Sequence, residues 1–174
     1  MSCDNIQHNG DVLKKMLISF VSHQDTKFAA WILENVSFPN SMVDRITPAT
    51  SPDDERYLAQ NYNLHDKWPV SCEPFLQWVI EDKFSMGRPN FDQIDGVQFV
   101  DDVAPYEKMK IRLLNAGHSI LGIIGALQGA ETISACMENK SLVKFLIKFW
   151  DQEASPILDK VEGINLDVNF LNSL

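Results

Sequence analysis

Most of the hydrophobic periodicity along the chain is typical of helices. Apolar residues recur three or four positions apart in several segments, as they do along the buried face of an amphipathic helix. The helices expected from this pattern run from Val12 to Val21, Lys27 to Val36, Pro52 to Tyr62, Pro105 to Ala130 and Ser141 to Lys160. Asp11 is expected to cap the first helix, after a turn at Asn9 and Gly10. Ser51 followed by Pro52 is a strong start signal for the third.

Two short segments have the composition of strands instead. They are Trp68–Glu73 and Val97–Val100, each bounded by Pro, Asp or Gly. The segment Ser85–Asn90 between them is expected to be a loop because of its Gly, Pro and Asn content. Pro156 is expected to kink or divide the last helix. The sequence therefore predicts a mainly helical domain with a small strand pair.

The longest expected helix, over residues 105–130, carries apolar residues on nearly every side, which is typical of a helix buried in a domain. Its polar residues therefore need partners or a cavity. Four are present: Glu107, Lys110, Asn115 and His118. Taken singly, each fits an ordinary role: Glu107 and Lys110 as an ion pair three residues apart, and Asn115 and His118 with hydrogen bonds to the backbone. Together they fall within an arc of roughly 140° on an ideal helix, which fits a lined cavity better.

Length and charge exclude several classes of protein. A chain of 174 residues suits one domain, and 15 Lys and Arg against 24 Asp and Glu give a net charge of −9, which argues against nucleic acid as a partner. No apolar N-terminal stretch resembles a signal peptide, and the longest apolar run, Ile120–Leu127, is far shorter than the about 20 residues that span a bilayer. A cytoplasmic protein without a membrane partner is expected.

Cysteine and histidine usage points the same way. Cys3, Cys72 and Cys136 show no paired spacing, which favours reduced thiols. The four histidines are scattered, and no group of Cys, His and Glu has the spacing of zinc ligands. No metal is therefore expected.

Four ordered segments resemble one known family. They are Ser2–Asn5 followed by Asn9 and Gly10, then Pro39–Pro48, Glu73–Asp82 and Lys110–His118. In that order they are similar to the mannitol dehydrogenase family of long-chain polyol dehydrogenases, over essentially the whole chain. The resemblance implies that residues 1–174 are the family's C-terminal domain, a helical bundle-like fold of the 6-phosphogluconate dehydrogenase C-terminal type. Because no strand is followed by G-x-G-x-x-G, the Rossmann domain is expected to be absent. The family's distal Arg-Phe-x-Asn-Pro type stretch is also missing, so the chain is expected to be trimmed at both ends.

The resemblance also implies catalytic roles for four residues. Lys110 matches the family's catalytic lysine, the general base in alcohol oxidation and the general acid in ketone reduction. Asn5 and Asn115 match the asparagines whose amides hold the substrate oxygen, and Glu107 matches the carboxylate that guides protons to the lysine. Such groups suit the reaction, because removing hydride from a secondary alcohol develops alkoxide character on its oxygen.

Two further residues are implied in substrate binding. His118 matches a histidine that orients the substrate, and Asp44 matches a position near it. The function implied is the substrate-binding and catalytic domain of a zinc-independent polyol 2-oxidoreductase that converts D-mannitol to D-fructose, with NAD or NADP bound mainly by a domain absent from the chain. The alternative is a truncated, non-enzymatic module that binds a polyol or an interaction partner. Apolar surface exposed by the missing domain is expected to cause weak self-association.

Overall fold

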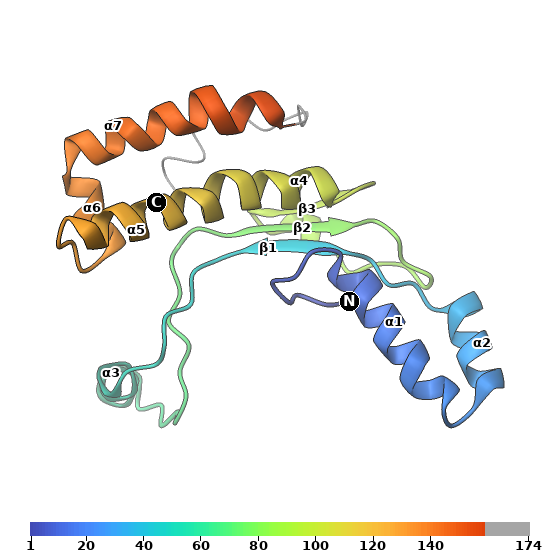
Figure 1. Cartoon of the computed structure of the whole chain (residues 1–174). Helices are drawn as coiled ribbons and strands as arrows, with labels where there is room; N and C mark the ends of the chain where they lie inside the picture. Colours follow the sequence, from blue (N-terminus) through green and yellow to red (C-terminus); the bar gives the residue numbers. More distant parts are fainter. Residues whose placement is uncertain (159–174) are drawn as a thin grey trace.

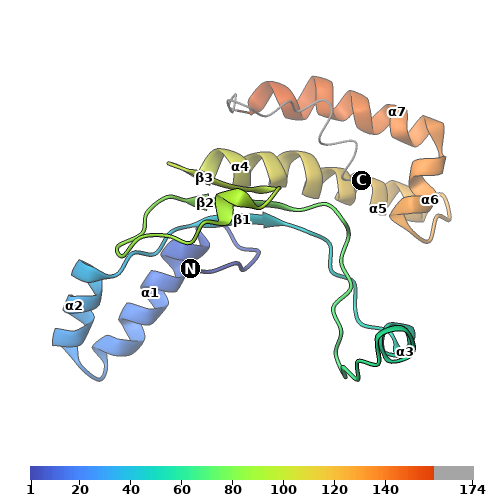
Figure 2. The same cartoon turned by 180° about the vertical axis from the view of Figure 1, so that it is seen from behind.

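A three-stranded sheet lies between two helical layers in the computed structural model, which describes residues 1–158 (Figure 1). One face of the sheet is covered by a long helical rod made of α4 (Ala104–Met109), the π-helical turn η2 (Lys110–Asn115) and α5 (Ala116–Leu127). On the other side lies the hairpin of α1 (Asn9–Ser22) and α2 (Thr26–Asn35), as the reverse view also shows (Figure 2).

The remaining helices lie farther from the sheet. The short α6 (Ile133–Glu138) turns the chain back, so that α7 (Lys140–Phe149) runs along the rod on the side away from the sheet. A second π-helical turn, η3 (Trp150–Ala154), and a 3-10 turn, η4 (Ser155–Ile157), continue α7. The helix α3 (Pro52–Tyr62) projects from the sheet on two long connections.

The sheet has the order β1-β2-β3 and mixed direction. β1 (Ser41–Asp44) pairs antiparallel with β2 (Gln77–Glu81), and β2 pairs parallel with β3 (Val97–Val100). The strand expected over Val97–Val100 is thus confirmed, whereas the one expected over Trp68–Glu73 is wrong, since those residues are irregular. Neither β1 nor β2 was expected. For β1 the reason is that Pro39 and Asn40 are typical of a break, although here they directly precede an edge strand.

Most of the expected helices are confirmed with small shifts. α3 spans Pro52–Tyr62 as expected, and Ser51 accepts from the Asp54 amide in a complete capping box. The first helix begins at Asn9 and not after Asp11, so the expected Asp11 cap is wrong; His8 precedes the helix in a left-handed conformation. Residues 105–130 are helical as far as Leu127, while the end expected at Lys160 lies outside the described residues.

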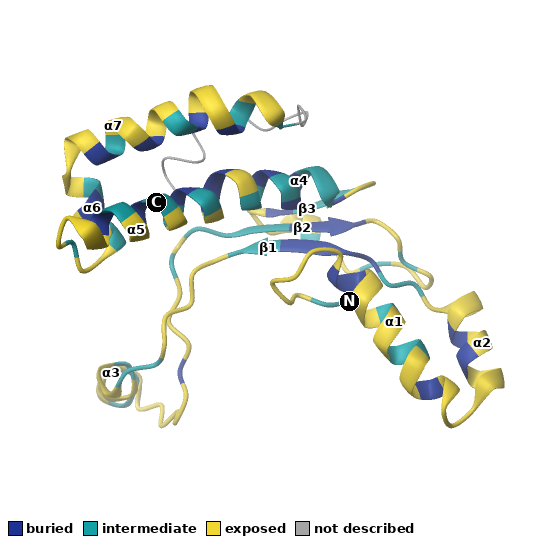
Figure 3. Cartoon of the chain, viewed as in Figure 1, coloured by how far each residue is buried: buried dark blue, intermediate teal, exposed yellow. Residues whose placement is uncertain are grey.

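The core consists of clusters between the layers (Figure 3). Met42 and Val79 of the sheet pack against Tyr106 of α4, and Leu113 and Leu121 of the rod pack against α6 and α7. Toward its C-terminal end, however, the rod is uncovered on one side: Ile123 is 65% exposed and Leu127 83%. The expectation of a helix buried on every side is therefore wrong for the described part of the chain.

A mainly helical fold is confirmed, with a sheet of three strands where a pair was expected. Within residues 1–158, no helix is both long and apolar enough to cross a membrane. All three cysteines are free thiols, two of them exposed and Cys136 buried.

Candidate active site

A polar cavity of about 120 Å³ lies where the N-terminal segment and β1 meet the start of the helical rod. Its polar lining consists of Asp4, Asn5, Gln7, Glu107, Lys110 and Asn115, together with Ser41. Met42, Val43 and Ile111 contribute apolar wall. An amine, several amides and a buried carboxylate therefore face one small space.

The Lys110 amine is held between an amide and a carboxylate. Its Nζ donates a hydrogen bond of 2.9 Å to Asn5 Oδ1 and lies 4.0 Å from Asp44 Oδ1. The Lys110 side chain is only 11% exposed and that of Asp44 13%. The Lys110 amine is thus held in place by Asn5, which is 105 positions away in the sequence, and by Asp44.

Asp44 experiences competing effects at the end of β1. Burial raises the pKa of its carboxyl, the neighbouring Lys110 charge lowers it, the Glu73 carboxylate raises it and His118 lowers it, with a net increase above the ordinary value. Desolvation therefore outweighs the nearby lysine at this carboxyl.

A π-helical turn brings two of the cavity residues onto one side of the rod. Lys110 and Asn115 are the first and last residues of η2, and the Ala116 N–H reaches back five residues to the Ile111 carbonyl. In an α-helix, residues five apart differ by about 140° in direction, whereas the wider π turn, whose hydrogen bonds join residues five apart, brings them closer in direction. Both side chains accordingly reach the same cavity.

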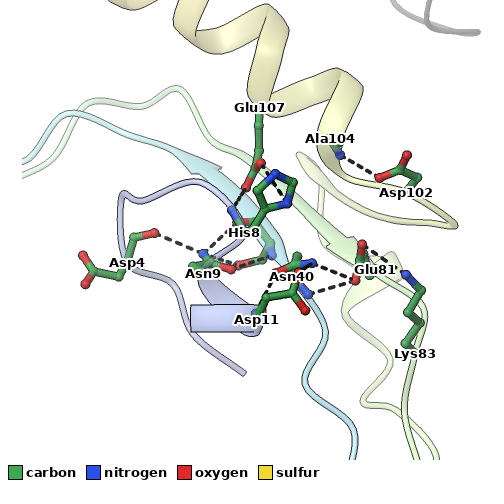
Figure 4. Close-up of polar contacts among 11 residues, drawn as sticks. Asp4, His8, Asn9, Asp11, Asn40, Glu81, Lys83, Asp102, Ala104 and Glu107 are labelled. Atoms are coloured by element: carbon green, nitrogen blue, oxygen red, sulfur yellow. Dashed lines mark hydrogen bonds and ion pairs between the residues drawn. The ribbon is translucent and has the colours of Figure 1, made fainter. Parts of the chain in front are cut away.

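Glu107 connects the cavity with an exposed histidine (Figure 4). Its Oε1 accepts a hydrogen bond of 3.0 Å from the backbone N–H of His8, and its Oε2 lies 4.0 Å from the ring atom Nδ1 of His8. The Glu107 side chain is almost fully buried, while that of His8 is 56% exposed. Glu107 therefore pairs with His8 and not, as the simplest reading of the sequence has it, with Lys110.

A buried asparagine anchors the N-terminal segment that carries Asn5. The Asn9 side chain, 1% exposed, donates to the carbonyls of Asp4 and Ser41 at 3.0 and 2.8 Å and accepts from the Ser41 N–H at 2.9 Å. Gly10 allows the start of α1 to lie close to the segment before β1, because a Cβ at Gly10 would lie 2.5 Å from the Phe38 and Pro39 carbonyl oxygens.

A second buried pair continues the same network toward the sheet (Figure 4). Glu81 accepts from the Asn40 N–H at 3.1 Å and pairs with Lys83 at 3.2 Å, while Asn40 accepts from the Asp11 N–H. Sequence reasoning missed Asn9 and Asn40 because asparagine beside Gly or Pro is typical of turns. Their occurrence in two of the family-like segments was the one available signal.

Asp44 and His118 differ in position from the other expected site residues. The cavity lining includes Asn5, Glu107, Lys110 and Asn115 but neither Asp44 nor His118. His118 Nδ1 lies 2.9 Å from the Leu114 carbonyl oxygen, so that nitrogen carries the hydrogen and donates it. His118 nevertheless lies close enough to Asp44 to affect its pKa. Among residues 1–158, no three His, Cys, Asp or Glu side chains converge into a metal-binding group.

Comparison with known protein families accounts for nearly all of the chain. Residues 1–93 match the model described as mannitol dehydrogenase Rossmann domain, and residues 102–173 match the mannitol dehydrogenase C-terminal domain. The chain belongs to the mannitol dehydrogenase family. Our expectation of a single C-terminal domain over residues 1–174 differs from this division, which assigns α1 to β2 to the Rossmann-domain model although the sequence contains no G-x-G-x-x-G.

Individual members of the mannitol dehydrogenase family are similar over the whole chain. The mannitol 2-dehydrogenase of Aspergillus clavatus is 49% identical over 100% of this chain and 35% of its own length, and that of Aspergillus oryzae is 47% identical over 96% and 34%. The chain thus spans about a third of these relatives.

Solved structures of similar proteins share the fold. A substrate-free D-sorbitol dehydrogenase superimposes with a TM-score of 0.92 at 40% identity, covering 99% of this chain and 36% of that one. Pseudomonas fluorescens mannitol 2-dehydrogenase, in a ternary complex with NAD and D-mannitol, gives 0.81 at 44% identity, covering 99% and 35%.

Proposed function

We propose that this chain supplies the polyol-binding and proton-transfer part of an NAD(P)-dependent polyol 2-dehydrogenase, with D-mannitol and D-fructose as the substrate pair. The observation that carries the proposal is the contact between Lys110 Nζ and Asn5 Oδ1, in a cavity that Asn115 and Glu107 also line. Kinship to mannitol 2-dehydrogenases supports the choice of substrate.

The side chains of the cavity suit the two tasks that this reaction requires. Neutral Lys110 accepts the proton of the substrate hydroxyl as hydride leaves the carbon, and as an ammonium group it returns a proton in ketone reduction. Because Asn5 Oδ1 accepts from Lys110, its Nδ2 hydrogens are left for the substrate oxygen, and the Asn115 amide donates from the other end of η2. Two neutral donors then stabilise the developing alkoxide without a metal.

Glu107 is proposed to exchange the proton with solvent. Its carboxylate lies between the cavity and the exposed His8 ring, so a proton taken up by Lys110 can leave on the side away from the substrate. Asp44 lies 4.0 Å from the Lys110 amine and His118 lies near Asp44, and both are proposed to bind other hydroxyls of the polyol.

A nicotinamide cofactor fits this set of groups. When bound, NAD or NADP accepts the hydride, a step that none of the lining side chains can perform. The residues described here bind the substrate oxygen and move its proton, and the cofactor is proposed to bind mainly to the part of the family's Rossmann domain that lies outside this chain.

Substitution of Lys110 tests the proposal in the full-length protein that contains this chain. Lys110→Ala is expected to lower kcat for mannitol oxidation by about 10² to 10⁴, the usual contribution of a general base. Lys148→Ala, on an exposed position of α7, is the matched control and should leave the rate unchanged. A wild-type rate in Lys110→Ala would show that Lys110 is not the base.

The 174-residue chain alone is expected to be inactive. Calorimetric titration of this chain with NAD should give no appreciable heat, and mixing it with mannitol and NAD should produce no NADH. Appreciable affinity for the cofactor would contradict the placement of its binding site outside the chain.

A further inference from the structure

We propose that Trp150 is a positioning residue for catalysis: it holds the π-helical turn η2 in the register that directs Lys110 and Asn115 into the same cavity. The inference rests on the proposed function, and it assigns a role to a residue about forty positions away from Lys110 that is not among those lining the cavity.

The π turn is the feature that needs support. A π-helix inside an α-helix is rare and is usually confined to one turn, because the i to i+4 bonds of its neighbours must be given up locally. Here the Ala116 N–H is shared between the carbonyls of Ile111 and Leu113, so the bonds at the end of η2 do not follow the α-helical pattern. A contact from outside the rod can decide which pattern prevails.

Trp150 provides that contact. Its indole N–H donates a buried hydrogen bond of 3.1 Å to the Leu113 carbonyl, inside η2. The ring also lies on Gly117, the second residue of α5, where a Cβ would come within 3.0 Å of Trp150 Cζ2. Trp150 therefore contacts the π turn itself and the first turn of α-helix that follows it.

The surroundings of Trp150 make the contact rigid. Trp150 begins η3, the second π-helical turn, and belongs to the same buried cluster as Met109, Leu113 and Leu146. An indole fixed by this packing can transmit a precise position to the Leu113 backbone. If the turn relaxed to α-helix, residues before or after it would rotate, and Lys110 and Asn115 would no longer face the same space.

The test uses Trp150→Phe in the full-length protein, since phenylalanine keeps an aromatic ring but has neither the indole N–H nor the second ring that lies on Gly117. We expect kcat to fall about tenfold or more, because displacements of about 1 Å in a catalytic group cost up to about 10² in rate. KM for the polyol should change by less than about threefold, and the pH profile of kcat/KM should shift, because it reports the base in the free enzyme.

Two further variants separate positioning from packing. Trp78→Phe is the matched control: within residues 1–158 the buried Trp78 indole N–H has no hydrogen-bond partner, so its removal should leave kcat and the pH profile unchanged. Gly117→Ala forces the Trp150 ring to move without removing its N–H, and it should reproduce the kinetic change. It also replaces Trp150→Phe if that variant does not fold.

A crystal structure of Trp150→Phe decides the point independently of activity. The inference predicts loss of the hydrogen bond between Ala116 and Ile111 and a longer distance from Lys110 Nζ to Asn5 Oδ1, now 2.9 Å. An unchanged turn, or wild-type kcat and pH profile in both variants, would overturn it. Should the wild-type protein not oxidise polyols, the proposed function fails, and the variant structure alone decides whether Trp150 holds the turn.

Discussion

Asp44 is a carboxyl whose immediate partner is a lysine and whose pKa is nevertheless raised. The reason is that removal from water costs the charged form more than the Lys110 amine at 4.0 Å returns, and the Glu73 carboxylate adds to the cost. Ionisation of Asp44 therefore destabilises the folded state, and the nearby Lys110 amine reduces this cost without cancelling it.

The stability of the protein should depend on pH through Asp44. Since its folded-state pKa is higher than its unfolded value, the native state binds more protons in the interval between the two, and stability falls as pH rises through it. Asp44→Asn removes this dependence, so the midpoint of urea unfolding should rise relative to wild type from pH 4 toward neutrality. A constant difference between the two proteins across that range would contradict the expected sign.

Several site residues could be predicted from the sequence because they lie on one helix. The spacing of Glu107, Lys110 and Asn115 is local information, and the structure brings all three to the same cavity. The pairing of Lys110 with Asn5 was accessible only through the resemblance, because no local pattern connects residues 105 positions apart. The widened turn that aligns Lys110 with Asn115 has no propensity signal in the residues that form it.

At the scale of elements, the edge strand β1 depends on side chains as much as on its neighbour β2. The Asn9 side chain forms hydrogen bonds that join the start of α1 to the Asp4 carbonyl and to Ser41 of β1. Because these groups are buried, the contact fixes the N-terminal segment, and with it Asn5, against the sheet.

Loss of the Asn9 side chain should therefore affect stability and substrate binding together. Asn9→Ala leaves the Ser41 amide and carbonyl without their partner, which is expected to cost about 1–3 kcal/mol in urea unfolding. KM for the polyol should also rise, as the segment carrying Asn5 loosens. The control, Asn35→Ala, removes an exposed bond to the Trp31 carbonyl within α2 and should change stability by less than about 0.5 kcal/mol. Equal effects of the two variants would show that Asn9 does not anchor the segment.

Helices were easier to predict than strands for a physical reason. The signals that start α3, Ser51 and Pro52, act on the next few residues and are visible in the sequence. β1 and β2 are stabilised by partners 33 to 39 residues away, such as Ser41 opposite Ile80 and Asp44 opposite Gln77. The segment Trp68–Glu73 has strand-like composition but no paired neighbour, and it stays irregular.

At the scale of the whole molecule, two surfaces expose large apolar side chains. On α1 and α2 these are Met16, Phe20, Phe28 and Trp31, and on α5 they are Ile123 and Leu127. Apolar side chains exposed in this way on a folded protein are typical of a contact with another part of a protein. Since the chain spans about a third of its relatives, we expect the remaining two thirds of such a protein to cover it.

The 174-residue chain in isolation should consequently self-associate, because nothing then covers these side chains. Its mean mass by light scattering is expected to rise with concentration in spite of the net charge of −9. Burial of apolar surface stabilises the association by about 25 cal/mol per Å², whereas the electrostatic repulsion between the chains is screened by salt. Phe20→Ser combined with Leu127→Ser should weaken the association, whereas Lys15→Ser on an exposed position of α1 should not. A constant monomer mass for the wild-type chain at the highest concentrations would show that the exposed residues are too dispersed to act as one association surface. Only the binding of the cofactor would then support the expectation that a further domain covers this chain.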